Sequence, residues 1–259
     1  MHVPLAVVSV VALVLLLGAE RMWPASRSQR GEWLNNGAAF ALTIMSHIVL
    51  VALWPPAETG LVNALGGGLL DLRPLPWLAG ALIYLVAMDL GEYLFHRAQH
   101  SIPALWAMHS LHHSDRGLNA LTAQRHFWFE PMIKSVSIWL VVALLFKVNA
   151  SILAFYAAVS LYHLFTHANL RVGFGPLAWL LNSPQFHRVH HSREPEDFNT
   201  NFAALLPIFD VMSGSYRRPR AGQFPATGLE ETPEAATDLV TWPLRGFLKR
   251  APVRISTEA

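Results

Sequence analysis

Long apolar stretches without a charged residue limit this chain to a membrane fold. Four such stretches carry no Asp, Glu, Lys or Arg: Val3–Leu17, Gly37–Trp54, Trp77–Met88 and Ser151–Phe165. Charged residues make up only 14% of the 259 residues, whereas about 25% is usual for a soluble domain. Because an apolar helix of about 20 residues crosses a bilayer, the sequence predicts an all-α integral membrane protein with about four transmembrane helices.

The first stretch, Val3–Leu17, has two interpretations. A cleaved signal peptide carries basic residues before its apolar run, whereas here Arg21, Arg27 and Arg30 follow the run. We therefore favour a retained transmembrane helix, with a cleaved signal as the alternative. The helix of the second stretch is expected to end at Pro55-Pro56, because proline removes a backbone hydrogen bond.

The later stretches predict one long helix and one hairpin. A helix over Trp77–His100 would be about 36 Å long at 1.5 Å per residue. This exceeds the ~30 Å hydrocarbon core of a bilayer, so its last turns should leave the membrane. The apolar segments Met132–Val148 and Ser151–Phe165 are separated by Asn149. They predict a helical hairpin that enters the membrane and returns on the same side.

Basic residues predict the orientation. Segments on the cytoplasmic side of a membrane are enriched in Lys and Arg, and the tail contains Arg217, Arg218 and Arg220. We expect a multi-pass protein of the inner (cytoplasmic) membrane, with its N-terminus outside and a histidine-rich helical cap on the cytoplasmic side. Three regions follow: transmembrane helices and an outer loop at 1–76, a catalytic region with the hairpin at 77–216, and a loosely ordered cytoplasmic tail at 217–259.

Histidines with helical spacing dominate the central part of the chain. The pattern HxxHH occurs twice, and positions i, i+3 and i+4 share one face of a helix. Two further pairs stand at i and i+4. The ten residues of these groups are His96, His100, His109, His112, His113, His163, His167, His187, His190 and His191. A repeated triplet predicts metal binding, because neutral imidazole is the commonest metal ligand in proteins.

The number of imidazoles indicates two metal ions. One ion needs three or four protein ligands, so ten imidazoles suit two ions with about five nitrogens each. The chain has no cysteine, which excludes thiolate ligands and iron–sulfur clusters. Structural zinc sites normally include cysteine. We therefore predict two iron ions with positions open for dioxygen; zinc could replace iron in a purified sample.

Polar side chains near these histidines are candidates for orienting their ring N–H groups. The expected residues are Asp89, His126, Asp197 and Asn199, and further candidates are Glu92, Asp115 and Glu130. For the acids the alternative is surface charge or a helix cap. A structural role for His126 is equally open, and His47 is best explained by a hydrogen bond between membrane helices.

Several segments together carry a family resemblance. They are HRAQH at 96–100, HSLHH at 109–113, HRVHH at 187–191, Asn119-Ala120-Leu121-Thr122 with Arg125-His126, and Asp197-Phe198-Asn199. Over roughly Asp89 to Tyr216 the chain resembles the fatty acid hydroxylase/sterol desaturase superfamily of membrane di-iron oxygenases. The resemblance implies that the ten histidines bind both irons and that dioxygen is used with external electrons. A separate electron-donor protein is expected, because no cytochrome b5-like domain is fused.

The implied reaction is hydroxylation or desaturation of a C–H bond in a lipid such as a fatty acyl chain or sterol. Four aromatic residues are candidates for the lipid entrance or, alternatively, for interfacial anchors: Trp106, Phe127, Trp128 and Phe186. The alternative function is a non-catalytic membrane metal-binding protein or a metal transporter, although a transporter would place its ligands near the membrane midplane. Membrane lipids are expected around the chain, and no nucleic-acid partner is expected.

Overall fold

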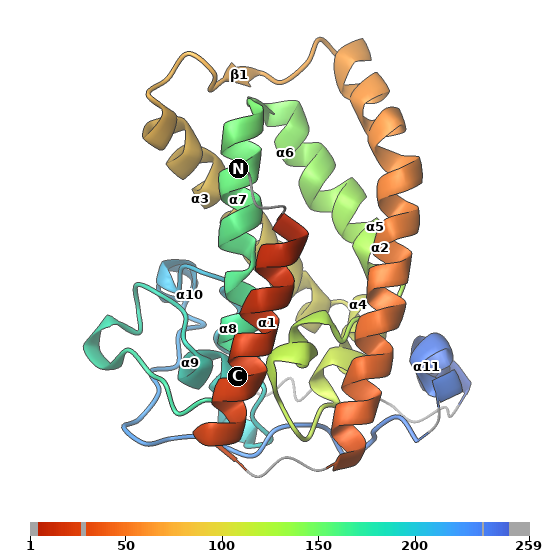
Figure 1. Cartoon of the computed structure of the whole chain (residues 1–259), viewed down its shortest axis with the longest axis vertical. Helices are drawn as coiled ribbons and strands as arrows, with labels where there is room; N and C mark the ends of the chain where they lie inside the picture. The colour runs from red at the N-terminus through yellow and green to blue at the C-terminus, as the bar shows by residue number, and fades with distance from the viewer. Residues whose placement is uncertain (1–4, 27–29, 235, 249–259) are drawn as a thin grey trace.

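The long helices of this protein run mainly along the long axis of the molecule, and most of its short helices lie in the lower half of Figure 1. The computed structural model describes residues 5–26, 30–234 and 236–248. Strand pairing within these residues is limited to two-residue strands and isolated bridges, which confirms the all-α prediction. The elements are α1 (Leu5–Met22), α2 (Arg30–Ala64), β1 (Leu70–Asp71), α3 (Trp77–Ser101), α4 (Pro103–His113), η1 (Ala120–Gln124), α5 (Glu130–Lys134), η2 (Ser135–Trp139), α6 (Leu140–Leu145), β2 (Phe146–Lys147), α7 (Ala150–Ser160), α8 (Tyr162–His167), η3 (Gly175–Leu177), α9 (Pro184–His190), η4 (Pro195–Asp197), α10 (Ile208–Ser213) and α11 (Ala236–Leu248).

Membrane-spanning capacity resides in three helical segments of the described residues. Glu32–Leu50, Trp77–Ser101 and Ala150–His167 are long and apolar enough to cross a bilayer. The chain is therefore a membrane protein. The expected span at Val3–Leu17 begins outside the described residues, and its remainder forms most of α1.

Helix α2 is longer than the sequence predicts. It continues through Pro55-Pro56 and ends at Ala64, so the expectation that this pair ends the helix is wrong. Proline removes one hydrogen bond of a helix and bends it. Membrane helices tolerate proline because neighbouring groups satisfy the freed backbone.

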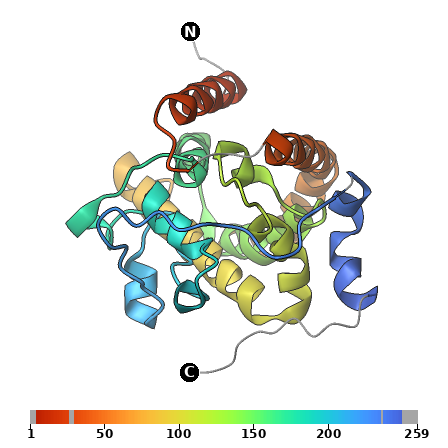
Figure 2. The ribbon, with the colours of Figure 1, turned by 90° about the horizontal axis from the view of Figure 1, so that it is seen from below.

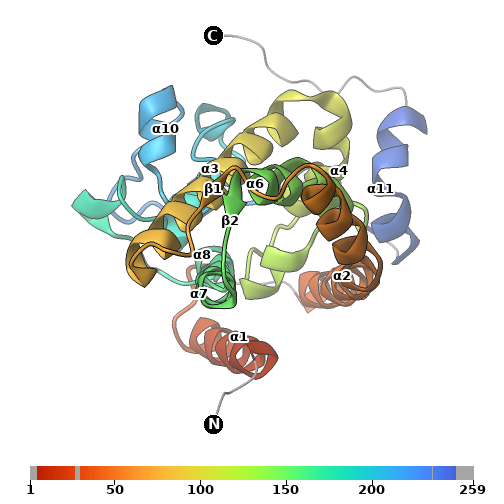
Figure 3. The same ribbon diagram turned by 90° about the horizontal axis from the view of Figure 1, so that it is seen from above.

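The predicted helical hairpin is present in the structure, and its entry into the membrane stays a prediction. Its first arm runs through α5, η2 and α6, and its second arm runs through α7 and α8. Asn149 caps α7 by accepting a hydrogen bond from Ile152 N at 3.1 Å, which satisfies a donor that the first turn leaves free. At the tip, β2 pairs in parallel with β1 (Figure 3). Gly68 permits this approach, because a Cβ there would lie 2.4 Å from the carbonyl carbon of Phe146.

The apolar core lies between α3 and the two hairpin arms. Met88 and Tyr84 of α3 pack with Ile138 of η2 and Ile152 of α7. The Tyr84 ring meets Tyr156 edge to face, with ring centroids 5.7 Å apart, a geometry that aromatic pairs favour. This packing fixes α3 against the hairpin, so the histidines at the ends of α3 and α8 come from elements held together above them.

The C-terminal region differs from the loosely ordered tail that its composition favours. Residues 217–234, here called the strap, cross the lower end of the molecule (Figure 2). Arg188 Nε donates to the carbonyl of Pro225 at 2.9 Å, and Gln185 Nε2 donates to that of Arg220 at 2.8 Å. The donors are side chains that lie far from the strap in the sequence, and the composition of the strap does not reveal them. Residues 249–259 lie outside the described residues.

Helix α11 follows the strap and packs on the same end of the molecule. Its Leu239 and Trp242 are buried with Leu111 of α4 and Ala39 of α2. Trp242 Nε1 also donates to Ser110 Oγ at 2.9 Å. The region after residue 217 therefore contributes to the packing around α4, the helix that carries the first histidine triplet.

Candidate metal centre

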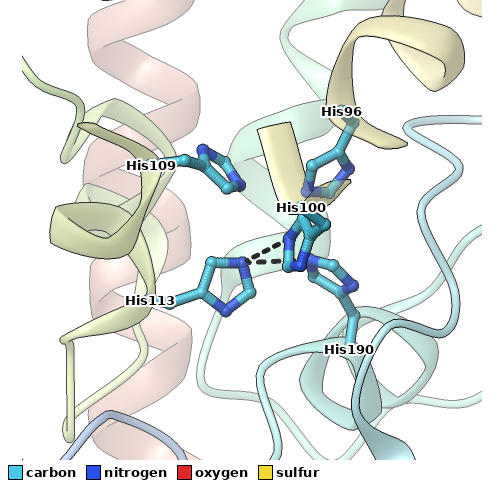
Figure 4. A group of neighbouring side chains, drawn as sticks. All are labelled: His96, His100, His109, His113 and His190. Carbon is cyan, nitrogen blue, oxygen red and sulfur yellow. Dashed lines mark hydrogen bonds between the residues drawn. The ribbon is translucent and has the colours of Figure 1, made fainter. Parts of the chain in front are cut away.

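Five histidines from three helices form the first group of the candidate centre. His96 and His100 come from the end of α3, His109 and His113 from α4, and His190 from α9. One ligand nitrogen from each ring lies within 4.8 Å of the others, and Figure 4 shows the rings turned toward one another. Their sequence separation reaches 94 positions, so the group exists only because the fold brings α9 to α3 and α4.

Four histidines form the second group beside it. His112 of α4, His167 at the end of α8, His187 of α9 and His191 at its C-terminus place one ligand nitrogen each within 4.8 Å of the others. All four side chains are buried. Nine of the ten predicted ligands therefore converge.

His163 is the predicted ligand that the structure does not bring into either group. Within the described residues its ring is absent from both sets of converging nitrogens. Its backbone carbonyl instead accepts the Nδ1–H of His167 at 2.8 Å. The two residues are four positions apart, so this contact joins neighbouring turns of the helix.

Each HxxHH triplet contributes to both groups, and the two triplets do so in opposite ways. In α4, His109 and His113 join the first group and His112 the second. In α9 the i and i+4 residues join the second group, and the i+3 residue His190 joins the first. One face of a helix therefore serves two sites, because α4 and α9 approach each other with their triplets crossed.

Local sequence explains where these short helices begin. Pro103 occupies the first turn of α4, directly after α3 ends. Ser183 caps α9 by accepting from Phe186 N at 3.2 Å, and Pro184 follows at the first helical position. A capping serine and an N-terminal proline both favour a helix start, so the second triplet is placed on a helix.

Backbone carbonyls fix the tautomers of three rings. Nδ1–H donates to a carbonyl in His96 (to Phe202, 2.7 Å), in His190 (to Thr200, 2.7 Å) and in His167. A carbonyl can only accept, so Nδ1 carries the proton and Nε2 keeps a lone pair. These three rings are prepared to bind a cation through Nε2.

The Nε2 atoms of neighbouring histidine rings face one another. Their distances show whether the site suits metal ions. Nε2 of His190 lies 3.1 Å from Nε2 of His113, and Nε2 of His167 lies 2.8 Å from that of His187 and 3.1 Å from that of His112. Within the described residues, His96 Nε2 and both nitrogens of His109 have no hydrogen-bond partner. Buried nitrogen lone pairs without donors are costly. Because the converging ligand atoms in both groups are imidazole nitrogens, they fit transition-metal ions.

Burial keeps these imidazoles neutral. It lowers the pKa of His112, His113, His187 and His191 well below the ordinary value, with nearby rings adding to the effect. The same burial lowers the pKa of His190 to about 3. Metal ligands must be deprotonated, so these rings are competent ligands at neutral pH.

The residues expected to orient the rings have mixed outcomes in the structure. Asp89 accepts the backbone N–H groups of Leu205 and Leu206 at 2.9 Å each, so it anchors a loop and touches no ring nitrogen. Asp197 is buried and lies 3.3 Å from Arg217 Nε. The side chain of Asn199 lies near the His100 ring.

His126 lies against the centre without joining either group. Its ring stacks on that of His112, with centroids 4.8 Å apart and planes 9° apart. Its Nδ1 lies 2.9 Å from Glu130 Oε1.

The backbone carbonyls of Phe202 and Thr200, which accept the Nδ1–H groups of two histidine rings, could not be predicted from the sequence, because every residue has a carbonyl.

The four aromatic residues proposed for an entrance do not share one place. Trp106 lies over the first group, with its ring 5.0 Å from that of His100. Phe186 is fully buried and contacts Tyr216. Phe127 packs in the α11 cluster, and Trp128 Nε1 donates to the carbonyl of Val240. Only Trp106 therefore lines the metal centre among these four.

The fold and the site define a helical membrane protein with two adjoining, buried groups of histidine nitrogens suited to metal ions. The chain belongs to the fatty acid hydroxylase family, whose sequence profile matches residues 81–215. This match contains both histidine groups and ends two residues before the strap begins.

Characterised relatives match the same region. Alkylglycerol monooxygenase of Xenopus tropicalis is 34% identical over 148 residues, which cover 56% of this chain and 32% of the relative. The ornithine lipid hydroxylase OlsE of Rhizobium tropici is 30% identical over 136 residues, which cover 52% of this chain and 41% of the relative. The matches thus span about a third to two fifths of the relatives' length. No solved structure matches the chain.

Proposed function

We propose that this protein is a membrane-bound oxygenase that hydroxylates or desaturates a lipid C–H bond with dioxygen and external electrons. The observation that carries the proposal is the convergence of nine buried imidazoles in two adjoining groups of five and four. Each group would hold one iron ion. Bound iron supplies the activation of dioxygen for attack on an unactivated C–H bond.

The protein's own contribution is to hold and orient ligands and to exclude water. The carbonyls of Phe202, Thr200 and His163 hold three Nδ1–H groups, which leaves Nε2 free to bind. The core of α3 and the hairpin fixes the helix ends that carry the rings. Nearly all of the rings are buried, so bulk water is kept from the centre.

A lipid substrate follows from the relatives and from the membrane fold. The relatives are named for alkylglycerols and for ornithine lipid. In this chain the five-histidine group draws two ligands from the last turns of a membrane helix, at His96 and His100. An alkyl chain in the bilayer would therefore need to move only a short way along α3 to reach the centre.

We further propose that the centre faces the cytoplasm of the inner membrane and receives electrons from a separate protein. Arg217, Arg218 and Arg220 lie at the same end of the molecule as the histidine groups, and basic segments favour the cytoplasmic side. Periplasmic and cytoplasmic reporter fusions at the C-terminus distinguish the two orientations. Reporter activity on the outer side would contradict this part of the proposal.

The decisive experiment combines metal analysis with lipid analysis. The protein is purified from iron-supplied cells, and the lipids of cells with and without the gene are compared by mass spectrometry. We expect close to two irons per chain and one lipid class shifted by one oxygen or by two hydrogens. A His187→Ala variant, expressed equally, should show no lipid shift.

A different outcome separates the alternative functions. Bound metal without any lipid change would indicate a non-catalytic metal-binding protein. Metal flux into proteoliposomes would indicate a transporter. Either result overturns the oxygenase proposal.

A further inference from the structure

Glu130 is a buried carboxylate that lies beside the two histidine groups. It begins α5 and its side chain is 2% exposed. Its Oε1 lies 3.6 Å from His109 Nδ1 and 2.9 Å from His126 Nδ1. Because His109 belongs to the five-histidine group and His126 stacks on His112 of the four-histidine group, one side chain contacts the surroundings of both.

We propose that Glu130 is a positioning residue shared by the two metal sites. Through His109 it orients a ligand of one group, and through His126 it supports a ligand of the other. The inference rests on the proposed function, since it requires both groups to bind metal.

The contact with His109 is the stronger part of the argument. Phe202 and Thr200 supply carbonyls for two other rings of the five-histidine group, whereas within the described residues neither nitrogen of His109 has a hydrogen-bond partner. With Nε2 turned to an ion, the other ring nitrogen of His109, Nδ1, has the Glu130 carboxylate as its neighbour at 3.6 Å. Carboxylates that accept the second N–H of a ligating histidine fix its orientation and raise its basicity.

His126 carries the influence of Glu130 to the second group. Its ring lies parallel to that of His112, and its Nδ1 lies 2.9 Å from Oε1 of Glu130. Its backbone carbonyl also accepts from Thr43 Oγ1 of α2 at 3.3 Å. The stack therefore limits the rotation of the His112 ring, one of the four ligands.

Charge supports the same role. Two divalent ions among neutral imidazoles leave a large positive charge in a buried place, which is costly without nearby negative charge. Other buried or partly buried acids nearby have other partners: Glu92 pairs with Lys134 at 2.6 Å, and Asp115 accepts from Asn36 Nδ2 at 2.7 Å. Glu130 Oε1, by contrast, lies 3.6 Å from Nδ1 of His109, a member of the five-histidine group.

Gln99 distinguishes positioning from a third metal site. His109, His126 and Glu130 place ligand atoms within 4.8 Å of one another, which is also compatible with an ion. Gln99 Nε2 donates to Glu130 Oε1 at 2.7 Å, and His126 approaches the same oxygen. This oxygen thus already accepts a hydrogen bond from the protein, which favours a positioning role over the binding of a third ion.

The test uses purified full-length protein loaded with cobalt(II), which reports coordination by its visible absorption. Glu130→Gln removes the charge at constant size, and we expect cobalt affinity at one site to fall about 10- to 100-fold, the usual loss for such partners, with a changed absorption band. Glu130→Asp should restore part of both. Glu92→Gln removes a neighbouring acid that touches neither group and should bind two cobalt ions as the wild type does.

Further readouts separate the outcomes. The metal-free Glu130→Gln protein should melt at the wild-type temperature; if it does not fold, Gln99→Met, which removes only the carboxylate's amide donor, should weaken the same cobalt ion several-fold. Unchanged affinity and absorption in Glu130→Gln, with two ions bound, overturn the inference alone. Three ions in the wild type with one lost in the variant also overturn it, in favour of a third site. A wild type that binds no cobalt instead removes the proposed function.

Discussion

His167 donates its Nδ1–H to the carbonyl of His163, one helical turn earlier, at 2.8 Å. The two residues thus lie in different surroundings in the structure, although their spacing predicts two equal ligands. His163 contributes its backbone, and His167 offers Nε2 to the four-histidine group.

This difference predicts that alanine variants of the two residues differ in metal content. His167→Ala should lose about one metal ion per chain, because structural metal affinity depends on each ligand. His163→Ala keeps the carbonyl and should retain the wild-type content. The measurement is elemental analysis of both purified variants. Equal loss in the two would show that the His163 ring is a ligand.

Acid should destabilise the protein through its buried imidazoles. Burial lowers the pKa of His190 to about 3 and that of His187 and His191 well below the ordinary value of 6.5. The folded state therefore favours the neutral rings. Their contribution to stability is complete above pH 6.5 and is lost as pH falls toward 3. Melting curves of the metal-free protein in detergent should shift to lower temperature from pH 7 downward.

The same change in pH should release bound metal, because protons compete for the ligand nitrogens. A His190→Asn variant should show a weaker dependence of melting temperature on pH. A melting temperature that rises on acidification would contradict this account.

Glu20 predicts a pH dependence of the opposite sign. It lies beyond the apolar run of α1, and burial raises the pKa of its carboxyl to about 7, against the lowering effect of the donors at Asn169 and Ala120. A folded pKa above the unfolded 4.5 means that the contribution is present below pH 4.5 and is lost as pH rises through about 7.

Glu20→Gln tests this carboxyl directly. The amide oxygen can still accept the two backbone N–H groups, both of which donate to Glu20 Oε1 at 2.8 Å. The variant should therefore melt above the wild type at pH 8 and close to it at pH 5. Parallel curves across this range would show that Glu20 does not titrate in the folded protein.

Arg125 should be required for stability, although it touches no metal ligand nitrogen. It is fully buried and donates to Asn36 Oδ1 at 2.6 Å and Ser114 Oγ at 2.8 Å, with Glu32 Oε2 at 3.2 Å. Arg125→Met leaves these acceptors and a carboxylate unpaired, and such losses cost about 3–5 kcal/mol. Denaturation in detergent measures the loss.

The matched control for this prediction is Arg73→Met. Arg73 pairs with Asp71 at 2.6 Å, but both side chains are exposed, and surface pairs contribute little. A comparable loss of stability in the two variants would show that burial does not set the value of the Arg125 network.

Alanine substitution should disturb the docking of the strap at one of its two glycines and not at the other. Gly228 has φ +98°, and a Cβ there would lie 2.6 Å from Arg116 Cγ and 2.9 Å from its Cα. Gly222 has φ +72° but no neighbour within 4 Å. Both alanine variants carry backbone strain, and only Gly228→Ala adds a collision. Chelators should therefore remove metal faster from Gly228→Ala than from Gly222→Ala; equal rates would contradict a role of the strap in retention.

Local signals in the sequence predicted the membrane helices and the histidines. Uncharged runs mark spans, and imidazoles at i, i+3 and i+4 mark a helix face. The division of each triplet between two groups follows from how α4 and α9 cross, which no local pattern encodes. Acceptor carbonyls such as that of Phe202 also leave no trace in composition.

The remaining differences have the same origin in tertiary structure. Pro55-Pro56 reads as a helix end, yet α2 continues to Ala64 because long-range context decides whether a proline ends or bends a helix. The composition of the strap favours a loosely ordered tail, yet the side chains of Arg116 and Arg188 donate hydrogen bonds to its backbone carbonyls. For the strap, these partners lie far away in the chain.

The position of the strap in the sequence also determines when the centre is covered during synthesis. All nine converging histidines precede it, so they leave the ribosome while the lower end is still uncovered. Once the strap has docked, with Arg193 N donating to the carbonyl of Ala226 at 3.0 Å, an ion leaving by that end must first break those contacts. We therefore expect a metal ion to enter the centre more readily before the strap docks than to leave it afterwards.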